Sequence, residues 1–476
     1  MSIGTKIAKN TSVFLISQII SYVIGFLYTI YMARYLGPEN FGILTFAISL
    51  TSLLAIFTDM GFNTLMTREI ARDKSLSSKY LSNFISMKII LVSVIFIITI
   101  SIINSLDYPK ETVYVIYLLM FNLILTTVSG AFYSLFQAYE ELKYQSLIIF
   151  LSSVLMLIGV FAAINYQASV VGFAAIYLVI SLFSLIYSLL VVYRTFELPK
   201  IDIDWKFWKD NIKLALPFGL IGIFATIYVY IDSSMLFFMQ GGEAVGIYGA
   251  SYRLVLVLLF IPSAINAAIF PVMSRLYSSS EHSLKKIVAK YFKYMIFIGI
   301  PMAVVGTILA DKIILFLYGT GYTKSVIVFQ ILIWATTFTF ANAAFVQLFQ
   351  SINKELLMTK ITGVFMVINV VLNLILIPKY SYIGASVNTL ITEFGIAILL
   401  ILIYSKSRYF IGKNQILATL FKIVLASTIT GIFTLIFRGL NLIILIMLST
   451  ALYIFISYIT NGIDAEDKKL IKNLVK

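Results

Sequence analysis

Long apolar segments follow one another along almost the whole chain, with only short polar stretches between them. A helix needs roughly 20 mainly apolar residues to cross the hydrocarbon core of a bilayer. A water-soluble globule of 476 residues could not bury this many apolar segments, because its polar shell would be too thin. The sequence therefore predicts an all-α polytopic membrane protein with 14 transmembrane helices. The predicted spans are 13–33, 42–62, 84–104, 113–137, 146–165, 169–193, 213–238, 245–273, 289–310, 325–350, 356–377, 383–404, 418–437 and 440–460.

The composition supports this prediction and excludes several kinds of site. Hydrophobic residues make up 61% of the chain and charged residues only 12%, against roughly 25% charged residues in a typical soluble domain. There is no cysteine and only one histidine, His282. Disulfides, cysteine-bound metals and catalysis by several histidines are therefore excluded, and we expect no bound metal.

Basic residues are distributed unevenly between the two sides of the predicted membrane. If the N-terminus is cytosolic, the cytosolic segments hold 28 lysines and arginines, whereas the outer loops hold 6. Short cytosolic loops of membrane proteins carry such an excess. We therefore predict a multi-pass protein of the cell (plasma) membrane with both termini in the cytosol. The same loops account for the net charge of +14, so we predict no binding to nucleic acid.

Three short sequences recur in the same order in the two halves of the chain. The matching pairs are 36–44 with 241–248, 135–137 with 348–350, and 171–172 with 383–384. Their nearly constant separation indicates a duplication. Each copy holds six predicted spans and so enters the membrane in the same direction. The pattern therefore predicts two parallel six-helix repeats, with a binding cavity between them.

The repeat defines the predicted domain boundaries. We expect an N-terminal six-helix bundle at 1–193, an interfacial linker at 194–212 and a C-terminal six-helix bundle at 213–405. Residues 406–476 add two further transmembrane helices and a cytosolic tail. In the linker, two tryptophans alternate with lysines, a pattern typical of a segment on the inner membrane surface.

Few charged residues lie inside the predicted spans, and each is a candidate functional residue because a charge in hydrocarbon is costly. Asp232 and Arg253 lie about ten residues before and eleven residues after the outer turn at Gly242, which places them at similar depths. Glu393 lies at a comparable depth in a later span. We expect these charges to share one polar cavity. The alternative is a buried ion pair that only fixes the packing of the helices.

Two other charges lie near the ends of predicted spans. Asp59 is close to the inner face, where it either gates the inner mouth or caps the following loop and pairs with Arg68. We favour the structural role for Asp59. Arg34 is at the outer end of the first span. It is a candidate substrate contact, although arginine side chains at such positions commonly extend to the membrane surface.

Four motifs resemble those of a known family. They are Ala33-Arg34-Tyr35-Leu36-Gly37-Pro38-Glu39-Asn40-Phe41-Gly42, Asp59-Met60-Gly61, Leu216-Pro217-Phe218-Gly219 followed by Ile231-Asp232, and Phe270-Pro271-Val272-Met273-Ser274-Arg275-Leu276. In the order and spacing of these motifs, the chain resembles the polysaccharide-transporter (Wzx-type) flippases of the multidrug/oligosaccharidyl-lipid/polysaccharide exporter superfamily. The resemblance covers about residues 5–460.

The resemblance implies a V-shaped pair of six-helix bundles around a cavity that opens alternately to the two sides. It implies transport of a polyprenyl-phosphate- or pyrophosphate-linked oligosaccharide from the cytosolic to the outer leaflet, driven by an ion gradient. In this interpretation Arg253 and Arg34 bind the substrate. Asp232, Glu393 and Asp59 line the cavity or bind a coupling Na+ or H+. The expected partners are the lipid-linked oligosaccharide, membrane lipids and glycan-assembly proteins.

Three alternatives remain open. The first two are a cation-coupled multidrug exporter and a peptidoglycan-precursor flippase of the same superfamily. The third is a membrane glycosyltransferase or polymerase. Such enzymes usually need a sizeable outer loop with paired carboxylates, and the longest outer segment here, about 104–113, is too short. We therefore expect that the protein is not an enzyme.

Overall fold

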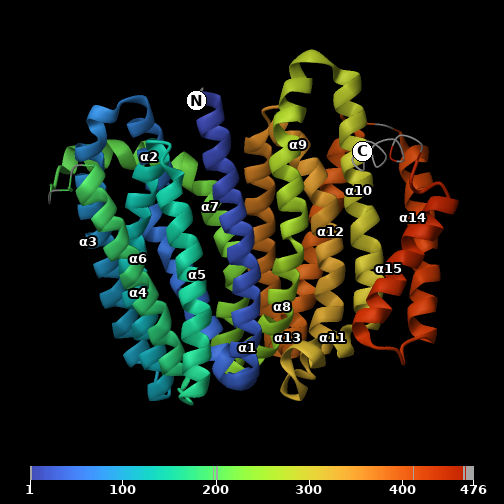
Figure 1. Cartoon of the computed structure of the whole chain (residues 1–476), viewed down its shortest axis with the longest axis horizontal. Coiled ribbons are helices and arrows are strands. Elements are labelled where there is room, and N and C mark those ends of the chain that lie inside the picture. Colours follow the sequence, from blue (N-terminus) through green and yellow to red (C-terminus); the bar gives the residue numbers. More distant parts are fainter. Residues whose placement is uncertain (1–2, 197, 200–201, 411, 465–466, 468–476) are drawn as a thin grey trace. The chain divides into compact units, whose positions relative to one another are not determined.

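The computed structural model describes residues 3–196, 198–199, 202–410, 412–464 and 467. Within these ranges the regular elements are all helices (Figure 1). They form two compact units, Met1–Gly246 and Ile247–Lys476. These units follow the packing of the helices, whereas the boundaries predicted above follow the repeat and stay a prediction.

The first unit contains seven α-helices and the start of an eighth in its described part. They are α1 (Ile3–Asp59), α2 (Phe62–Arg72), the short 3-10 helix η1 (Lys74–Leu76), α3 (Ser77–Asn104), α4 (Lys110–Ala138), α5 (Leu142–Asn165), α6 (Val170–Thr195), α7 (Trp205–Gln240) and the first turn of α8 (Gly242–Leu258). Helix α1 is broken at Gly37, which has φ 71° and ψ 173°. Glycine adopts a positive φ without a steric penalty, and the following Pro38 has no N–H to continue the helix.

The second unit contains the rest of α8 and the elements that follow it. They are α9 (Phe260–Ser279), α10 (Glu281–Ile308), α11 (Ala310–Tyr318), the 3-10 helix η2 (Thr320–Tyr322), α12 (Ser325–Ser351), α13 (Glu355–Ser405), α14 (Lys413–Ile436) and α15 (Leu442–Ile459). Helix α13 is broken at Ser381, which has φ 51° and ψ −134°. Helices α8 and α9 are separated at Leu259, shortly before Pro262, because this proline cannot donate to the carbonyl four residues earlier.

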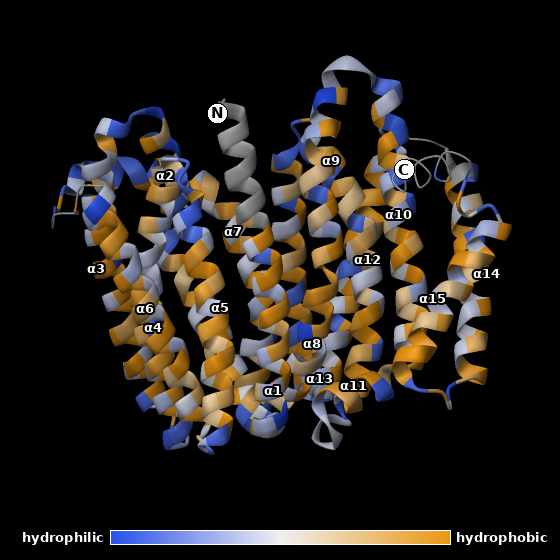
Figure 2. Ribbon diagram, viewed as in Figure 1, coloured by the Kyte–Doolittle hydropathy of each residue, from blue (hydrophilic) through white to orange (hydrophobic). Residues whose placement is uncertain are grey.

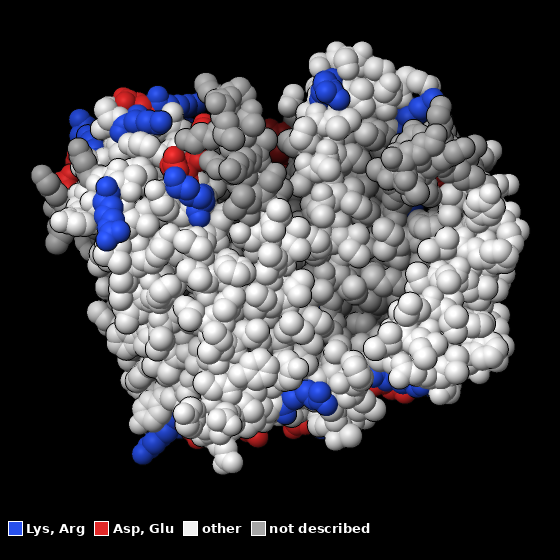
Figure 3. Space-filling view, viewed as in Figure 1, with Lys and Arg blue, Asp and Glu red and all other residues white. Residues whose placement is uncertain are grey.

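Twelve helices in the described ranges are long and apolar enough to cross a membrane. Two of them, 44 and 51 residues long, contain the breaks at Gly37 and Ser381. Hydrophobic residues cover the middle of the helices, and charged side chains lie at their ends on the face shown (Figures 2 and 3). The predicted class, an all-helical membrane protein with many spans, is therefore confirmed. The count of 14 spans and the repeat stay predictions.

Four turns in one half of the chain contain a residue with positive φ, and each has a counterpart with positive φ in the other half. The pairs with positive φ are Gly37 (71°) with Gly241 (82°), Asp107 (45°) with Gly319 (85°), Glu140 (59°) with Asn353 (59°), and Gln167 (51°) with Ser381 (51°). The distance along the chain between the two members is nearly the same in every pair. The turns at Glu140 and Asn353 also share the same pattern of backbone hydrogen bonds. The two halves therefore turn at corresponding positions.

The turns at Gly37 and Gly241 contact each other inside the first unit. A Cβ atom added at Gly42 would lie 1.8 Å from the carbonyl oxygen of Gly242, and one added at Gly246 would lie 1.8 Å from the carbonyl oxygen of Pro38. When Gly37 is aligned with Gly241, Gly42 corresponds to Gly246 and Pro38 to Gly242. The contact is therefore reciprocal, as in a two-fold interface, and it excludes any side chain at the two inner glycines.

The second part of the predicted linker belongs to α7 and is fastened to α3. Helix α7 begins at Trp205, and the carboxylate of Asp204 accepts a hydrogen bond from the amide of Phe207 at 2.9 Å. Trp208 is buried, and its Nε1 donates to Oδ1 of Asn83 at 3.0 Å. This tryptophan therefore stabilises the packing of α7 on α3, whereas Trp205 is exposed.

Ion pairs at both ends of the α14–α15 hairpin connect it to other helices of the second unit. Arg438, in the turn between the two helices, pairs with Asp311 of α11 at 2.7 Å. Burial alone would raise the pKa of Asp311, but the hydrogen bond and charge of Arg438 hold it below its usual value. At the other end, Lys293 of α10 pairs with Asp464 at 2.8 Å. Both contacts tie the hairpin to its neighbours in this unit.

Candidate functional site

A buried lysine forms the centre of a polar cluster in the first unit. The side chain of Lys88 on α3 is only 2% exposed, and its Nζ donates to Oδ1 of Asp59 at 2.8 Å and to Oδ1 of Asn63 at 2.6 Å. Oδ1 of Asp59 also accepts a hydrogen bond from the amide of Asn63 at 3.3 Å. Asp59 therefore caps the start of α2 and compensates the charge of Lys88.

Two small cavities lie next to this cluster. One, of about 490 Å³, is lined almost entirely by polar side chains of α2, α4 and α5, including Asn63, Tyr133 and Gln137. The other, of about 280 Å³, lies between the end of α1 and α7 and is lined by Asp59 and Thr226, among others. Asn63 therefore borders one cavity and Asp59 borders the other.

The expected pair between Asp59 and Arg68 is not formed within the described residues. Arg68 pairs with Glu69 at 2.6 Å, and its guanidinium lies over the ring of Phe218 at 4.9 Å. Glu69 is next to Arg68 on α2, so it is closer to Arg68 along the chain than Asp59 is. The carboxylate of Asp59 is already paired with Lys88.

Two of the motifs quoted above meet beside Asp59. A Cβ atom added at Gly61 would lie 2.5 Å from the carbonyl oxygen of Ala215, and one added at Gly219 would lie 2.5 Å from the carbonyl oxygen of Met60. The main chains of the α1–α2 bend and of α7 are therefore in direct contact. This contact holds Asp59 against α7 and explains why both motifs require glycine.

In the second unit, Glu393 lies in a cluster of buried amides. Asn342 of α12 donates through Nδ2 to Oε2 of Glu393 at 3.1 Å and to its backbone oxygen at 3.2 Å. Asn388 donates through Nδ2 to the backbone oxygen of Asn369 at 2.9 Å. The break at Ser381 folds α13 back on itself, so these residues from both of its segments meet.

Two acceptor oxygens of these amides have no hydrogen-bond donor in the described part of the chain. Oδ1 of Asn342 and Oδ1 of Asn388 are buried and accept no hydrogen bond within the described residues. The side chain of Glu393 is also largely buried. Buried oxygen atoms without donors are costly unless a proton or a cation reaches them. The described residues contain no group of three histidines, cysteines or acids that could hold a metal ion.

Arg253 lies half-buried on α8 in the second unit. Helix α8 is fastened to α12 just before this residue, where Oγ of Ser251 donates to the backbone oxygen of Ser325 at 2.7 Å. Burial raises the pKa of Tyr318 on α11, and the nearby charge of Arg253 lowers it in part. Among the described carboxylates of this unit, none forms an ion pair with Arg253.

The remaining predicted residues lie in the first unit. Asp232 is buried on α7 between helices, next to the buried Ser233 and Ser234. Arg34 is exposed on α1, one turn before the break at Gly37. Asp232 and Arg253 belong to different units, so their shared cavity stays a prediction, as does the participation of Glu393 in it.

Sequence reasoning missed Lys88, Asn63 and Asn342. The loop count of 28 basic residues includes Lys88, although this lysine lies inside a predicted span. A lysine within an apolar segment was therefore the signal that could have identified the cluster. Asn63 and Asn342 had no such signal, because isolated amides in membrane helices usually bond across helices.

The comparisons with known proteins identify the family. The sequence model of the polysaccharide biosynthesis protein family matches residues 7–277, more than half of the chain. The chain belongs to the polysaccharide biosynthesis protein family. A second family, MatE, matches residues 217–375. This result confirms the family-level resemblance that the four motifs indicated.

Proteins from an archaeon and a bacterium resemble this chain over most of its length. A protein of Haloferax volcanii named as the flippase AglR is 24% identical over 399 residues, which is 81% of each chain. A protein of Escherichia coli K12 named as an O-antigen transporter is 22% identical over 424 residues, 87% of this chain and 98% of its own.

The fold resembles that of a solved transporter. The structure of the lipid II flippase MurJ in an inward closed conformation superposes with a TM-score of 0.78 and 15% identity. The match covers 97% of this chain and 99% of that one. At this identity the likeness concerns the fold, which this member of the polysaccharide biosynthesis protein family shares almost from end to end.

Proposed function

We propose that this protein is a flippase that moves a polyprenyl-phosphate- or pyrophosphate-linked oligosaccharide from the cytosolic to the outer leaflet. The family membership carries the proposal, together with full-length relatives named as a flippase and an O-antigen transporter. The glycan needs a protein to cross the bilayer, because each of its unpaired polar groups costs several kcal/mol in hydrocarbon. A wet cavity that opens alternately to the two sides removes this barrier while the lipid tail stays in the bilayer.

We also propose 14 spans arranged as two parallel six-helix repeats and a C-terminal hairpin. Dividing α1 at Gly37 and α13 at Ser381 turns the two longest candidate helices into two spans each. The four corresponding turns support the duplication. Because basic residues are concentrated in the segments predicted to be cytosolic, we place both termini in the cytosol, and we assign the protein to the plasma membrane. Glycan-assembly proteins would supply the substrate.

We assign to Arg253 the role of binding the phosphate group of the substrate. Its charge lies about 16 Å along α8 from the start of the helix, and no described carboxylate of its own unit neutralises it. Arg34 is a second, more exposed contact at the end of the first segment of α1. Arginine binds phosphate strongly because its planar group presents several donors to the anion.

Replacing Arg253 by alanine is expected to lower transport at least about tenfold, because one charge-assisted contact to an anion contributes roughly 1.5–3 kcal/mol. Transport is measured by complementation of strains that lack a defined flippase and by a surface-glycan assay. The matched control is Arg194→Ala, at an exposed arginine near the end of α6. Normal surface glycan in the Arg253→Ala strain would remove the assigned role. Strains lacking a lipid II flippase or a drug exporter distinguish the alternative functions.

We propose that Glu393 and its amide neighbours bind the coupling H+ or Na+. The support is that the buried Oδ1 atoms of Asn342 and Asn388 accept no hydrogen bond within the described residues, while Asn342 bonds to Glu393. Carboxylate and amide oxygens are the ligands that hard cations prefer. Asp232, a second buried acid on α7, is a further candidate for the same role. Asp59 lines the water-accessible space near the other end of α1.

Glu393→Gln is expected to keep the packing of the cluster but to abolish the response to an ion gradient, because the amide cannot gain or lose the charge. Transport in proteoliposomes is compared with and without an imposed pH or sodium gradient. Glu355→Gln, at an exposed acid on the same helix, is the control. A gradient response equal to that of the wild type would exclude Glu393 as the coupling residue.

A further inference from the structure

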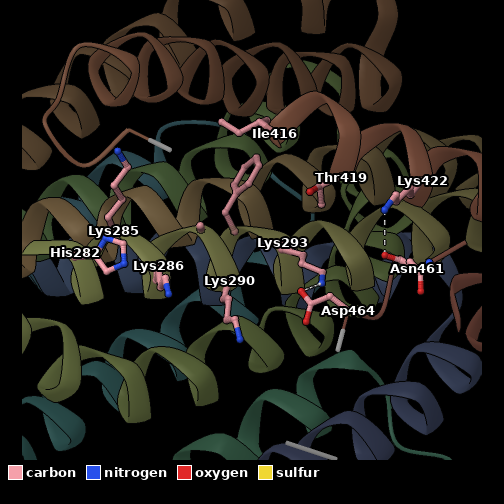
Figure 4. A pocket seen from close by; sticks show the side chains of 13 residues that line it. His282, Lys285, Lys286, Lys290, Lys293, Ile416, Thr419, Lys422, Asn461 and Asp464 are labelled. Carbon is pink, nitrogen blue, oxygen red and sulfur yellow. Dashed lines mark hydrogen bonds and ion pairs between the residues drawn. The ribbon is translucent and has the colours of Figure 1, made fainter. Parts of the chain in front are cut away.

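A basic cavity lies at one end of α10, apart from the residues assigned to transport. Its volume is about 610 Å³, and it is enclosed by α10, α14 and the segment after α15 (Figure 4). Four lysines line it from α10, namely Lys285, Lys286, Lys290 and Lys293. Lys286, Lys290 and Lys293 follow one another at spacings of four and three residues, which places these three along one side of the helix, whereas Lys285 is one residue out of this spacing. Lys422 contributes a fifth ammonium from α14.

The positive charge of this cavity is only partly compensated. Lys293 bonds Asp464 at 2.8 Å and also pairs with Asp467. Burial alone would raise the pKa of Asp464, but Lys293 and the charge of Lys290 hold it below its usual value. Lys422 donates to the backbone oxygen of Asn461 at 3.3 Å. A net positive charge therefore remains.

Lys285 and Lys286 account for most of this excess. Neither forms an ion pair with a carboxylate among the described residues, although Lys285 is half-buried. The nearby Glu281 pairs with Arg408 instead, at 3.4 Å. A half-buried ammonium without a partner is stabilised by an anion, and lysine is a common ligand of phosphate.

The same cavity has an apolar wall. Phe292 and Ala289 of α10 and Ile416 of α14 line it beside the lysines. Both helices are long and apolar enough to cross a membrane, and the cavity lies at their ends. Basic pockets between membrane helices at the cytosolic side bind the head groups of anionic lipids. A soluble phosphate compound would make no use of the apolar wall.

We propose that this cavity binds the phosphate head group of an anionic lipid. With the orientation proposed above, the lipid belongs to the inner leaflet. The head group contacts the ammonium groups of Lys285, Lys286 and Lys290, and the start of the acyl chains lies against Phe292 and Ile416. The bound lipid joins α10 to α14 and so stabilises the docking of the C-terminal hairpin. This role is separate from that of Arg253.

The test measures lipid binding to the purified full-length protein by native mass spectrometry. Wild-type protein is expected to retain phosphatidylglycerol in preference to phosphatidylcholine. The variant Lys285→Gln/Lys286→Gln/Lys290→Gln is expected to bind phosphatidylglycerol at least about tenfold more weakly, because each lysine near an anionic head group contributes appreciably. Lys422→Gln tests the opposite wall and is expected to weaken binding to a smaller extent.

The matched control removes the same charge elsewhere, at the exposed Lys354, Lys360 and Lys406, and is expected to leave lipid binding unchanged. Equal losses in the two triple variants would overturn the proposal, as would equal retention of the two lipids by the wild type. Inorganic phosphate is added as a competitor. Complete displacement of the lipid at comparable concentrations would show a simple anion site and contradict the lipid assignment. Because binding is measured without transport, either result leaves the proposed flippase activity unaffected.

Discussion

Oxidation of a Glu39→Cys/Gly242→Cys variant is expected to stop transport completely, and reduction is expected to restore it. A Cβ atom at Gly242 would lie 3.0 Å from the carbonyl oxygen of Glu39 and 3.7 Å from its Cγ, so a cysteine sulfur in the place of this Cγ would lie close to that Cβ atom. A disulfide joins cysteines whose side chains lie this close together. The disulfide would hold the turns at Gly37 and Gly241 together. If these turns separate whenever the cavity opens toward them, a locked protein cannot complete the transport cycle.

The natural chain makes this experiment simple, because it contains no cysteine. The two single variants, Glu39→Cys and Gly242→Cys, receive the same oxidant and are expected to keep their transport. The fraction of cross-linked protein is measured by labelling free thiols with a maleimide. Full transport by a completely cross-linked protein would show that the turns stay together throughout the cycle.

Asp59→Asn is expected to lower the free energy of unfolding by an amount near the lower end of roughly 3–5 kcal/mol, the usual cost of breaking a buried ion pair. The side chain of Lys88 is 2% exposed and loses its ionic partner in the variant, whereas Asp59 itself is 39% exposed, which reduces the effect. Thermal unfolding in detergent measures the change.

The double variant Asp59→Asn/Lys88→Met distinguishes the effect of leaving Lys88 without its partner from the effect of removing both charges. Methionine fills a similar volume without a charge, so the double variant is expected to be more stable than Asp59→Asn alone. A conservative change at the neighbouring exposed acid, Asp73→Asn, controls for the loss of one carboxylate. Equal instability of the single and double variants would contradict a compensating role for Asp59.

The sequence alone predicted the class of fold because hydrophobic length is a local property. Any helix that spans a bilayer needs a long apolar run, so the presence of many membrane-spanning helices could be recognised without tertiary information. The glycine turns at Gly37 and Gly241 were also visible, because positive φ favours glycine. The contact between these turns could not be predicted, since it joins backbone segments from the two halves of the chain.

The candidate site was harder to predict because it depends on partners distant in the sequence. Asp59 was recognised as a charge near the end of a predicted span, but its partner Lys88 lies 29 residues away on another helix. Likewise, Glu393 was recognised, whereas Asn342 is 51 residues distant. A charged residue stands out against an apolar segment. An amide that bonds to it does not, because amides are common in such helices.

The reciprocal contact between the two turns is made by main-chain atoms, and this has a consequence for the sequence. In this contact Gly42 and Gly246 are constrained to lack a side chain, because a Cβ atom at either would lie 1.8 Å from a carbonyl oxygen. The residues beside them differ, with Asn40 and Phe41 in one turn and Ala244 and Val245 in the other. The contact therefore tolerates different neighbouring residues, so the two turns can differ in sequence without losing it.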